Sequence, residues 1–403
     1  MSIEQPRCLG LVADDVTGAG DASVQFARHG WDVFLSLDAR LKPGPTAVLN
    51  PGPTAVLNPG PAFLNADPAT GAGISVAGQS VIAVTTDCRA LDDGTAHART
   101  RDALSQLIDA GVDRVFLKID STMRGSVRGQ ISGALEAWRT RYADARAIVC
   151  PAYPRMGRTV QANQLLVHGE PVELTAIGRD PVTPVKTSIM SALIPVTPSI
   201  TLADAATDEH LVALAGAIAG AGPSAIAVGS GGLAEALATV WSARSARLEP
   251  DPAFSGPDLP MTARAAGANP RMLLLVTSLN PVSRLQVAEL REACPDVVVV
   301  LPPDDRGESS VVADTLAAEF STLVERERWD IVGLVGGDGA RAALNRLGAS
   351  GIRIAGSLLE GIPAGVIVGG AADGLAVFTK AGGFGGKDAL VRVAQGIRNN
   401  KGL

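Results

Sequence analysis

The sequence predicts an α/β fold with two doubly wound parallel-sheet-type domains, a larger N-terminal domain and a smaller C-terminal one. Short runs of strand-forming residues recur along the 403-residue chain. Each run ends in a polar or glycine-rich loop and is followed by a helical pattern, which is typical of strand–helix–strand units. Between residues 246 and 270 the periodicity stops and prolines accumulate, which indicates an interdomain linker. We therefore expect a domain at 1–245 and another at 271–403.

The expected strands follow from these runs in chain order. In the N-terminal domain they are Cys8–Ala13, Trp31–Leu37, Ser80–Thr85, Arg114–Ile119, Ala145–Cys150 and Ala225–Val228. In the C-terminal domain they are Met272–Thr277, Val297–Leu301, Ile331–Val335 and Leu375–Phe378. Residues 43–58 hold the octapeptide PGPTAVLN twice, and a degraded copy ends at residue 65. A repeat of this length is too short for a solenoid unit, so we interpret it as an expanded surface loop without chemistry.

The composition excludes several classes of protein. The 35 basic and 41 acidic residues give a net charge of −6, so the chain has no basic field for the backbone of a nucleic acid. The apolar runs are shorter than the ~18–20 residues that cross a bilayer, and the one near the N-terminus is too short for a secretory signal. We expect a cytoplasmic protein with no nucleic acid or membrane partner.

The cysteines and histidines point to neither a metal site nor a disulfide framework. The cysteines lie far apart, without C-x-x-C spacing, and we interpret them as buried thiols; they are Cys8, Cys88, Cys150 and Cys294. The histidines are scattered with no pair at helical spacing, which argues against a metal centre and a histidine-based hydrolase. They are His29, His97, His168 and His210.

The loop after the first strand is the first candidate site. Asp14, Asp15 and Asp21 lie in the segment DDVTGAGD, immediately before and within a helical pattern. Ligands collect where parallel strands end, because helix N-termini and free backbone amides converge there. Three closely spaced carboxylates are costly to bury unless they meet a cation or sugar hydroxyls. The alternative interpretation is a helix N-cap with solvated acids.

Further polar loops follow other strands. Lys118 and Asp120 share one side of the fourth strand, by alternation, and Arg124 follows among small residues. An arginine beside free helix amides is suited to a carboxylate or phosphate, although a serine–threonine cap with a surface arginine would look the same. Arg158 and Arg179 lie in loops rich in glycine and proline and are weak evidence taken singly.

The C-terminal domain repeats the strand-to-glycine-loop arrangement. Its loops contain Gly336-Gly337-Asp338-Gly339 and Gly382-Gly383, and Ser278 follows another strand. Such loops let backbone amides approach phosphates, so together they favour a nucleotide. The chain lacks a Walker loop, and the first strand is not followed by the GxGxxG fingerprint that a dehydrogenase on this fold requires.

Together these motifs resemble the four-carbon acid sugar kinase family, formerly known only as a domain of unknown function. The resemblance covers nearly the whole chain and rests on the order and spacing of the segments ADDVTGA (13–19), TDCR (86–89), KIDSTMRG (118–125), PAYP (151–154), GRT (157–159), RDP (179–181), GSGGLA (229–234), GGD (336–338) and TKAGGFG (379–385). It implies an N-terminal sugar-acid-binding domain and a C-terminal nucleotide-binding domain. The expected activity is phosphorylation of threonate, erythronate or 3-oxo-tetronate by ATP.

The resemblance also implies nucleotide contacts, which fall on Ser278, Gly336, Gly337, Asp338, Gly339 and Gly383; we add Gly382 to this set. Our expected substrate-binding residues are Asp14, Arg89, Lys118, Asp120, Arg124, Arg158 and Arg179. As a hypothesis, Arg124 and Arg179 hold the substrate carboxylate, Asp14 or Asp15 accepts the proton of the attacking hydroxyl, and Mg²⁺ bridges the ATP phosphates.

Two alternatives stay open at this stage. The segment at 15–21 is similar to the D-T-x-G-A-G-D signature of ribokinase-type kinases, which nominates Asp21 as a second candidate base. Because that signature is C-terminal in ribokinase-type kinases, we interpret the similarity as convergence or chance. Departures from the family pattern in the C-terminal motifs make a non-catalytic sugar-acid sensor the alternative function. Whether the chain forms a homo-oligomer is likewise open.

Overall fold

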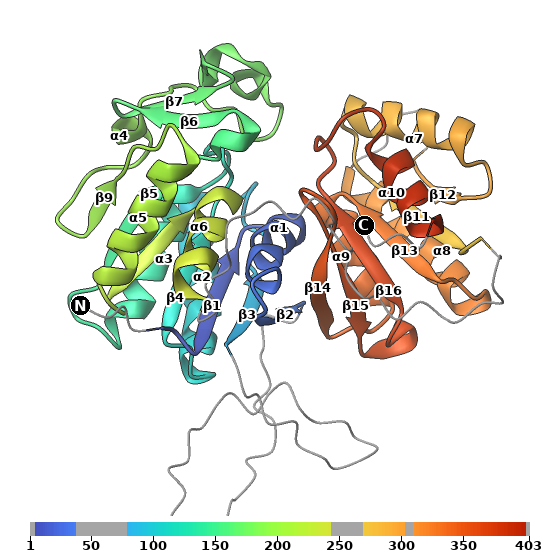
Figure 1. The fold of residues 1–403 in the computed structure, drawn as a ribbon, viewed down its shortest axis with the longest axis horizontal. Coiled ribbons are helices and arrows are strands. Elements are labelled where there is room, and N and C mark those ends of the chain that lie inside the picture. The colour runs from blue at the N-terminus through green and yellow to red at the C-terminus, as the bar shows by residue number, and fades with distance from the viewer. Residues whose placement is uncertain (1–4, 38–78, 243–268, 303–308, 400–403) are drawn as a thin grey trace, which may run out of the picture. The chain divides into compact units, whose positions relative to one another are not determined.

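The computed structural model describes residues 5–37, 79–242, 269–302 and 309–399. The repeat at 43–65 and nearly all of the expected linker lie outside the described residues. The chain forms two compact units (Figure 1), which we describe separately. Unit 1 comprises Met1–Asp14, His29–Phe34 and Asp38–Ser245, and unit 2 comprises Asp15–Arg28, Leu35–Leu37 and Ala246–Leu403.

Unit 1 is built on a parallel sheet. Its strands, in the order in which they lie in the sheet, are β2 (Asp32–Ser36, which ends in unit 2), β3 (Ser80–Thr85), β1 (Cys8–Ala13), β4 (Arg114–Lys118), β10 (Ala225–Gly229), β5 (Arg146–Cys150) and β9 (Ile200–Leu202). The pairs from β3 to β9 are all parallel. Every residue of β1, β3, β4 and β10 is buried, as expected of strands covered on both faces.

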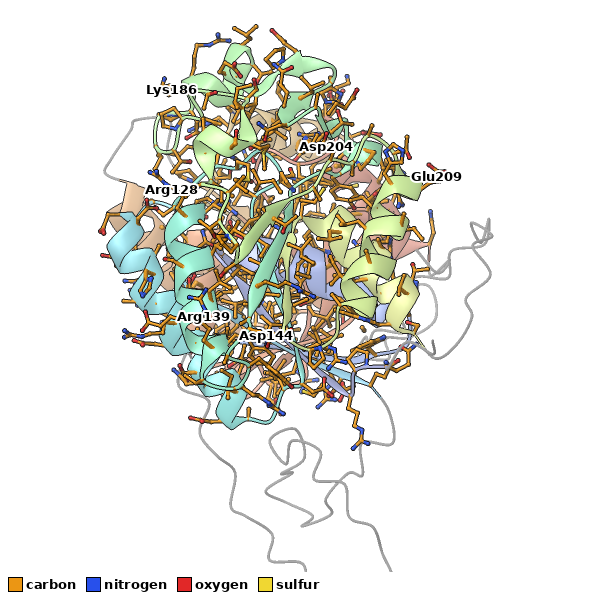
Figure 2. All side chains as sticks on the ribbon, turned by 90° about the vertical axis from the view of Figure 1, so that its left-hand side faces the viewer. Arg128, Arg139, Asp144, Lys186, Asp204 and Glu209 are labelled. Carbon is orange, nitrogen blue, oxygen red and sulfur yellow. The ribbon has the colours of Figure 1, made fainter. Side chains whose placement is uncertain are left out.

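Helices cover both faces of this sheet (Figure 2). They are α2 (Asp93–Asp109), α3 (Val127–Arg139), α5 (Asp208–Gly220) and α6 (Gly231–Trp241). Helices α2 and α3 pack against each other, and a Cβ added to Gly129 or Gly133 would overlap the carbonyl oxygen of Asp93 or His97. The two helices therefore meet backbone to backbone, at a separation that only glycine permits.

An excursion between β5 and α5 carries a small antiparallel sheet that the sequence analysis did not predict. It contains η2 (Pro154–Met156), β6 (Arg158–Gln161), β7 (Gln164–Val167), β8 (Glu170–Pro171), η3 (Val172–Leu174), η4 (Ala176–Arg179) and α4 (Met190–Leu193). These elements are only two to four residues long, which is too short to produce a hydrophobic period. They position Arg158, the first residue of β6, and Asp180, which follows η4.

Unit 2 contains a mixed sheet in the order β12 (Val298–Val300), β11 (Met272–Val276), β13 (Ile331–Val335), β16 (Ala376–Lys380), β15 (Ile362–Val368) and β14 (Gly351–Leu359). The first four strands are parallel. Strands β14 and β15 form an antiparallel hairpin that also pairs antiparallel with β16. The sequence analysis did not predict this hairpin, so the sheet is parallel-dominated rather than wholly parallel.

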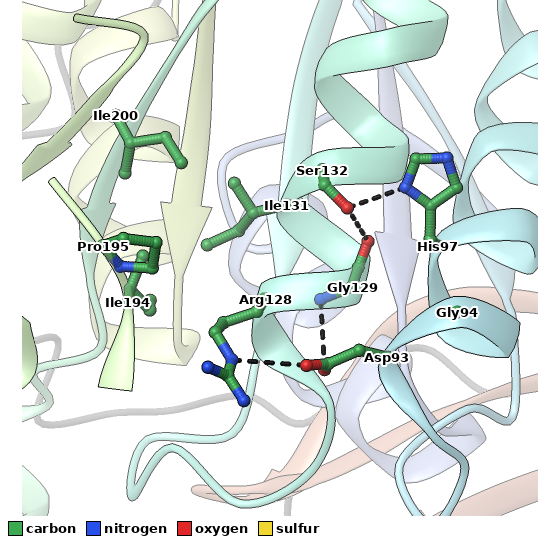
Figure 3. A pocket seen from close by; sticks show the side chains of 10 residues that line it. All are labelled: Asp93, Gly94, His97, Arg128, Gly129, Ile131, Ser132, Ile194, Pro195 and Ile200. Carbon is green, nitrogen blue, oxygen red and sulfur yellow. Dashed lines mark hydrogen bonds and ion pairs between the residues drawn. The ribbon is translucent and has the colours of Figure 1, made fainter. Parts of the chain in front are cut away.

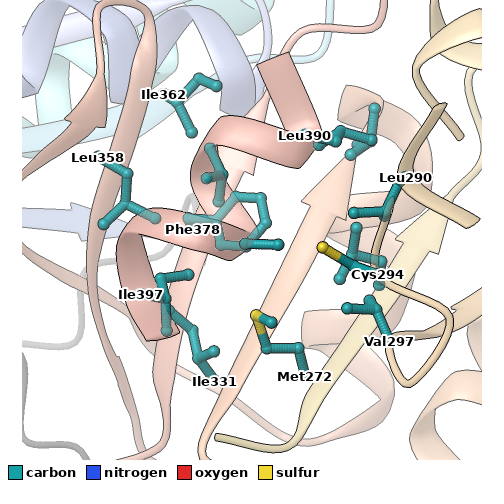
Figure 4. Packing of buried hydrophobic residues seen from close by; sticks show 14 of the residues in the cluster. Met272, Leu290, Cys294, Val297, Ile331, Leu358, Ile362, Phe378, Leu390 and Ile397 are labelled. Carbon is teal, nitrogen blue, oxygen red and sulfur yellow. The ribbon is translucent and has the colours of Figure 1, made fainter. Parts of the chain in front are cut away.

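The helices of unit 2 are α1 (Val16–Ala27), α7 (Pro281–Ala293), α8 (Ser309–Arg326), α9 (Gly337–Arg346) and α10 (Ala389–Arg398), and a turn of 3-10 helix, η5, covers Gly370–Ala372. One hydrophobic core joins α7 and α10 to the sheet (Figure 4). Met272, Phe378 and Leu390 are at most 2% exposed within it. Helix α1 packs on β14 and β15 and against α9, so it belongs to this unit although it directly follows β1.

The fold class and the strands agree with the sequence analysis. All ten expected strands are present, and their ends lie within two residues of the expected positions. The four cysteines are free and buried, as predicted. Among the helices of the described residues, none combines the length and apolar character needed to cross a membrane.

Candidate functional site

In unit 1, the expected site residues gather at one edge of the sheet because the strands are parallel and in register. Ala13 of β1 pairs with Thr85 of β3 and Lys118 of β4, and Lys118 pairs with Gly229 of β10. The loops that follow these strands therefore leave the sheet side by side. Asp14, Arg89 and Asp120 lie in these loops.

Asp14 and Arg89 form a bidentate ion pair. The Nε and Nη2 atoms of Arg89 donate to the two carboxylate oxygens of Asp14 at 2.7 and 2.8 Å. Asp14 is fully buried, whereas the side chain of Arg89 is 26% exposed. Gly125 lets the backbone of Arg89 approach closely. Its φ is +91°, and a Cβ there would lie 3.0 Å from the carbonyl oxygen of Arg89. Both oxygens of Asp14 are thus engaged, which suits positioning better than proton transfer.

Asp120 and Arg124 form a second pair, four residues apart. Arg124 Nη2 and Nε donate to the two oxygens of Asp120 at 2.8 and 3.1 Å, and the backbone and hydroxyl of Thr122 donate to Oδ2. Burial alone would raise the pKa of Asp120, but the charges of Arg124 and Arg89 and these hydrogen bonds outweigh it and hold the pKa well below its usual value. Asp180 also approaches Arg124, at 3.4 Å.

Arg158 adds a third positive charge to this group. Its Nη1 donates to the carbonyl oxygen of Met156, and among the described residues no carboxylate lies within ion-pair distance of it. Burial and the nearby charge of Arg124 lower the pKa of Arg158, and Asp120 opposes this. Such a half-buried guanidinium is suited to an incoming anion. We call Arg89, Arg124 and Arg158 the arginine cluster.

The other two expected substrate-binding residues lie differently. Lys118 is buried at the end of β4, where its Nζ donates to the carbonyl oxygen of Ile119 at 3.0 Å. Arg179 is exposed at the end of η4. The residue that reaches the arginine cluster from this loop is instead Asp180, and its backbone partners Val182 and Thr183 hold it in a turn. The sequence analysis included Asp180 only within the segment RDP (179–181). Its contact with Arg124, 56 residues away along the chain, leaves no local signal in the sequence.

A separate cavity of about 400 Å³ lies between α2, α3 and the segment before β9 (Figure 3). Arg128 pairs with Asp93 at 3.3 Å, and His97 contacts Ser132 and Glu136 at its rim. None of the expected site residues lines this cavity, which is bordered by Asp93, Gly94, His97, Arg128, Gly129, Ile131, Ser132, Ile194, Pro195 and Ile200.

In unit 2, three loops meet at one edge of the sheet. Val276, Val335 and Lys380 are neighbours across β11, β13 and β16, so the loops that follow them start together. They are residues 277–280, residues 336–339, which include the first turn of α9, and residues 381–388. The loops touch, since a Cβ on Gly382 would overlap the hydroxyl of Ser278 and a Cβ on Gly336 would lie 2.8 Å from Thr277 Oγ1.

Most of the expected nucleotide-binding residues lie in these loops. Gly383 lies against Asn280, whose Nδ2 would be 2.8 Å from an added Cβ, and Gly339 lies against Thr277. Asp338 is exposed in the first turn of α9. The sequence analysis missed Asn280, which caps α7 through the Val282 amide.

Asp15 also belongs to unit 2. It caps α1, where its Oδ1 accepts from the amide of Gly18 and from Thr17 Oγ1. A Cβ on Gly337 would lie 3.6 Å from Asp15 Cβ and 3.9 Å from its Oδ2. The second carboxylate oxygen of Asp15 thus faces the 336–339 loop. Asp21 is half-buried farther along α1, and its carbonyl accepts from Gln25.

The loops of unit 2 contain groups suited to a nucleotide and to the metal ion that accompanies it. The cradle formed by Gly336, Gly337, Gly382 and Gly383, at the N-terminal ends of α9 and α7, fits the phosphates of a nucleotide. Among the described residues, no group of three histidine, cysteine or acidic side chains could hold a metal ion. Mg²⁺ in nucleotide sites is usually bound by one or two carboxylates together with phosphates and water, and Asp338 and Asp15 fit that donor set.

Comparison with known proteins completes the assignment. Residues 9–196 match a family model described as a sugar-binding N-terminal domain, and residues 301–390 match a nucleotide-binding C-terminal domain. The chain is 35% identical over 436 residues to the D-threonate kinase of Bordetella bronchiseptica, with 98% of each chain covered. It is 24% identical to the D-threonate kinase of Salmonella typhimurium, covering 94% of this chain and 96% of the relative.

A solved structure from Haemophilus influenzae shares the fold, with a TM-score of 0.64, 17% identity and coverage of 96% of this chain and 99% of that one. A sugar-binding domain joined to a nucleotide-binding domain defines a sugar kinase, a phosphotransferase with an alcohol group as acceptor. The chain belongs to the four-carbon acid sugar kinase family. The family resemblance and the kinase activity inferred from the sequence are therefore confirmed.

Proposed function

We propose that this protein transfers the γ-phosphoryl group of ATP to a hydroxyl of D-threonate. The observation that supports the substrate class is the arginine cluster, where Arg89 and Arg124 are paired while no carboxylate of the described residues lies within ion-pair distance of Arg158. A four-carbon sugar acid brings one carboxylate, which would complete this group. D-Threonate is the first candidate because it is the acceptor in the names of both relatives described above.

The residues of unit 1 bind and orient the acceptor in this proposal. Arg158 holds the substrate carboxylate, and the paired carboxylates of Asp14 and Asp120 accept hydrogen bonds from its hydroxyls. Arg124 is held by Asp120 and Asp180, so we assign it to shaping the site. This differs from the hypothesis drawn from the sequence, in which Arg124 and Arg179 held the carboxylate.

The residues of unit 2 bind ATP and receive the proton. The amides of the 336–339 and 381–388 loops hold the phosphates. Asp15 accepts the proton of the attacking hydroxyl, because its Oδ2 faces Gly337 while its Oδ1 is fixed by the N-cap. Asp338 would hold Mg²⁺ together with phosphate oxygens, and the ion would supply charge neutralisation for phosphoryl transfer. Asp21 remains the second candidate base.

The test is release of ADP from Mg-ATP by the full chain with a panel of acceptors. The panel contains D- and L-threonate, D- and L-erythronate, their 3-oxo forms and several C5 and C6 acids. We expect turnover to be at least tenfold faster with D-threonate than with any other acid. Faster turnover with an erythronate or a 3-oxo acid would overturn the choice of substrate, and stabilisation by a sugar acid with no nucleotide binding would favour the sensor.

A further inference from the structure

Lys380 is a buried lysine to which the proposed function assigns no role. It ends β16 and is 0% exposed, which places it among the largest fully buried side chains. Its Nζ donates to the carbonyl oxygens of Ala381 and Gly382 at 2.9 and 3.1 Å. Among the described residues, no carboxylate lies within ion-pair distance of it. Burying a lysine without a counter-charge costs folding free energy, which indicates that Lys380 has a role that offsets this cost.

The carbonyl groups of the 381–388 loop are bound by buried donors. Besides Lys380, Ser283 Oγ donates to the carbonyl of Gly382 at 2.7 Å. Gln286 Nε2 donates to the carbonyls of Phe384, Gly385 and Gly386 at 2.9, 3.3 and 2.8 Å. Ser283 and Gln286 are both fully buried on α7. The loop thus presents its carbonyls to α7 and to Lys380.

This orientation determines where the amides of the loop point. In a planar trans peptide the C=O and the following N–H point in opposite directions. When the carbonyls of Ala381 and Gly382 turn toward Lys380, the amides of Gly382 and Gly383 turn away from it. Those are the glycines that lie against Ser278 and Asn280 in the nucleotide-binding loops.

We propose that Lys380 is a positioning residue of the ATP site, whose ammonium binds the loop carbonyls, aims the amides at the phosphates and supplies a positive charge behind them. The inference rests on the proposed function, in which the 277–280, 336–339 and 381–388 loops bind ATP. The main-chain carbonyl of Lys380 accepts from the amide of Gly336 at 3.0 Å. One residue therefore ties two of these loops together.

The proposal predicts that nucleotide binding takes up a proton near pH 8. The ionisable side chains on the surrounding elements of unit 2 are Asp15 at the N-cap of α1 and Asp21 on α1, Arg284, Glu289, Arg291 and Glu292 on α7, Asp338, Arg341 and Arg346 on α9, Arg353 and Glu360 at β14, and Lys387, Asp388, Arg392 and Arg398 before and on α10. None of them contributes to the pKa of Lys380, which burial alone lowers to about 8. Phosphates bound at the loop would raise this pKa, because they favour the charged form.

The experiment is calorimetric titration of the full chain with Mg-ADP at pH 8, in buffers with different ionisation enthalpies. We expect wild-type protein to take up about 0.3–0.5 proton per ADP, since the amine is half protonated near its pKa. Lys380→Arg should keep the affinity within tenfold and lose the proton uptake. Lys380→Met should weaken ADP binding at least 30-fold and raise the KM for ATP, with the KM for D-threonate within twofold of wild type.

Folding is checked separately by thermal unfolding and by D-threonate binding, which depends on unit 1. Equal proton uptake by wild type and Lys380→Arg, or unchanged ADP affinity in Lys380→Met, would overturn the role of Lys380. Gly337→Val separates the two proposals. If it leaves ADP affinity unchanged, the nucleotide loops themselves are wrongly assigned; if it weakens ADP binding while the Lys380 variants do not, only the inference about Lys380 fails.

Discussion

At the scale of single residues, the three arginines of the arginine cluster differ in whether a carboxylate already pairs with them. Arg89 and Arg124 each form a bidentate contact with an aspartate. Arg158 donates to a main-chain carbonyl, and its pKa is lowered by burial, raised by the charge of Asp120 and lowered by that of Arg124. Because Arg158 is partly buried and no carboxylate of the described residues lies within ion-pair distance of it, our proposal places the anionic group of the ligand there.

Replacement of Arg158 by glutamine should therefore weaken binding of the acid more than catalysis. We expect the KM for the sugar acid to rise about 30-fold, the equivalent of one charge-assisted hydrogen bond, with kcat changed less than threefold. The control is Arg155→Gln on the same segment, because the exposed Arg155 pairs with Glu235 and Asp208. Equal KM values for the two variants, measured by initial rates, would remove Arg158 from the site.

Replacing Asp15 by asparagine tests the proposed catalytic base while leaving helix α1 intact. Asparagine caps helices as well as aspartate does, so Asp15→Asn should retain α1 but lose the proton acceptor. We expect kcat to fall about 10²–10⁴-fold with little change in thermal stability. Asp92→Asn is the matched control, since Asp92 caps α2 in the same way. A kcat near the wild-type value would shift the role to Asp21.

Asp120 should govern stability at low pH. Its pKa is lower in the folded chain than the value of about 3.9 expected when unfolded. The ionised carboxylate therefore stabilises the fold fully above about pH 4, and this contribution is lost as the pH falls further. Asp120→Asn should lower the free energy of unfolding at pH 7 by about 3 kcal/mol, and the difference from wild type should shrink below pH 4.

Urea unfolding at pH 7, 4 and 3 measures this difference. Asp144→Asn, on an exposed turn (Figure 2), is the control and should change stability little at any of the three values. A difference between wild type and Asp120→Asn that stays constant across the pH range would show that the Asp120 pair does not act through its charge.

At the scale of elements, close packing of α2 on α3 aligns the loops that precede them. Asp93 at the start of α2 lies against Gly129 near the start of α3. The loops before these helices contain Arg89 and Asp120. A methyl group added to Gly129 would overlap the backbone of α2. The two helices would have to move apart, because a main chain cannot move aside as a flexible side chain can.

Gly129→Ala should accordingly destabilise unit 1, by about 2–3 kcal/mol in urea unfolding, and raise the KM for the sugar acid. Gly216→Ala is the helical control. A Cβ at Gly216 meets nothing within 4 Å, so alanine should stabilise α5 by about 0.5–1 kcal/mol. If both substitutions change stability in the same direction, the backbone contact between α2 and α3 does not limit their approach.

At the scale of the whole molecule, the chain passes from unit 1 to unit 2 between two consecutive aspartates. Asp14 pairs with Arg89 in unit 1, and Asp15 lies beside Gly337 in unit 2. Helix α1 thus follows a strand of one unit and packs with the other. The family model for the sugar-binding domain spans residues 9–196, so α1 lies inside that match while it packs with unit 2.

Amide hydrogen exchange should show this division. We expect D-threonate to slow exchange in the loops after β3 and β4 of unit 1. Mg-ADP should slow exchange at residues 16–20 and in the loops at 277–280, 336–339 and 381–388. Protection of residues 16–20 by D-threonate alone, and not by Mg-ADP, would contradict the assignment of α1 to the nucleotide-binding unit. The two ligands, added singly, serve as controls for each other.

The fold was predictable because parallel sheets and their loops have local signatures. Buried strands such as β1 and β13 are short apolar runs, and the glycine loops mark where they end. The hairpin β14–β15 was missed because Gly351, Gly356 and Gly365 interrupt any alternation along it. An added Cβ on Gly365 would overlap the carbonyl of Arg353. Glycine is required at this position only because β14 and β15 pair, so the sequence alone does not show the reason for it. The expected domain limits of 1–245 and 271–403 stay predictions.

The sequence by itself determined the ten strands expected from apolar runs and the family, and it predicted the loops proposed to carry the chemistry, because each depends on residues near one another in the chain. Only the tertiary structure decided which charges are already paired. Arg124 meets Asp180 across 56 residues, and for this reason our proposal assigns the substrate carboxylate to Arg158. It also placed Asp15 with the nucleotide loops and buried Lys380 behind them. Charge pairing and burial depend on distances in space, and spacing along the chain does not set those distances.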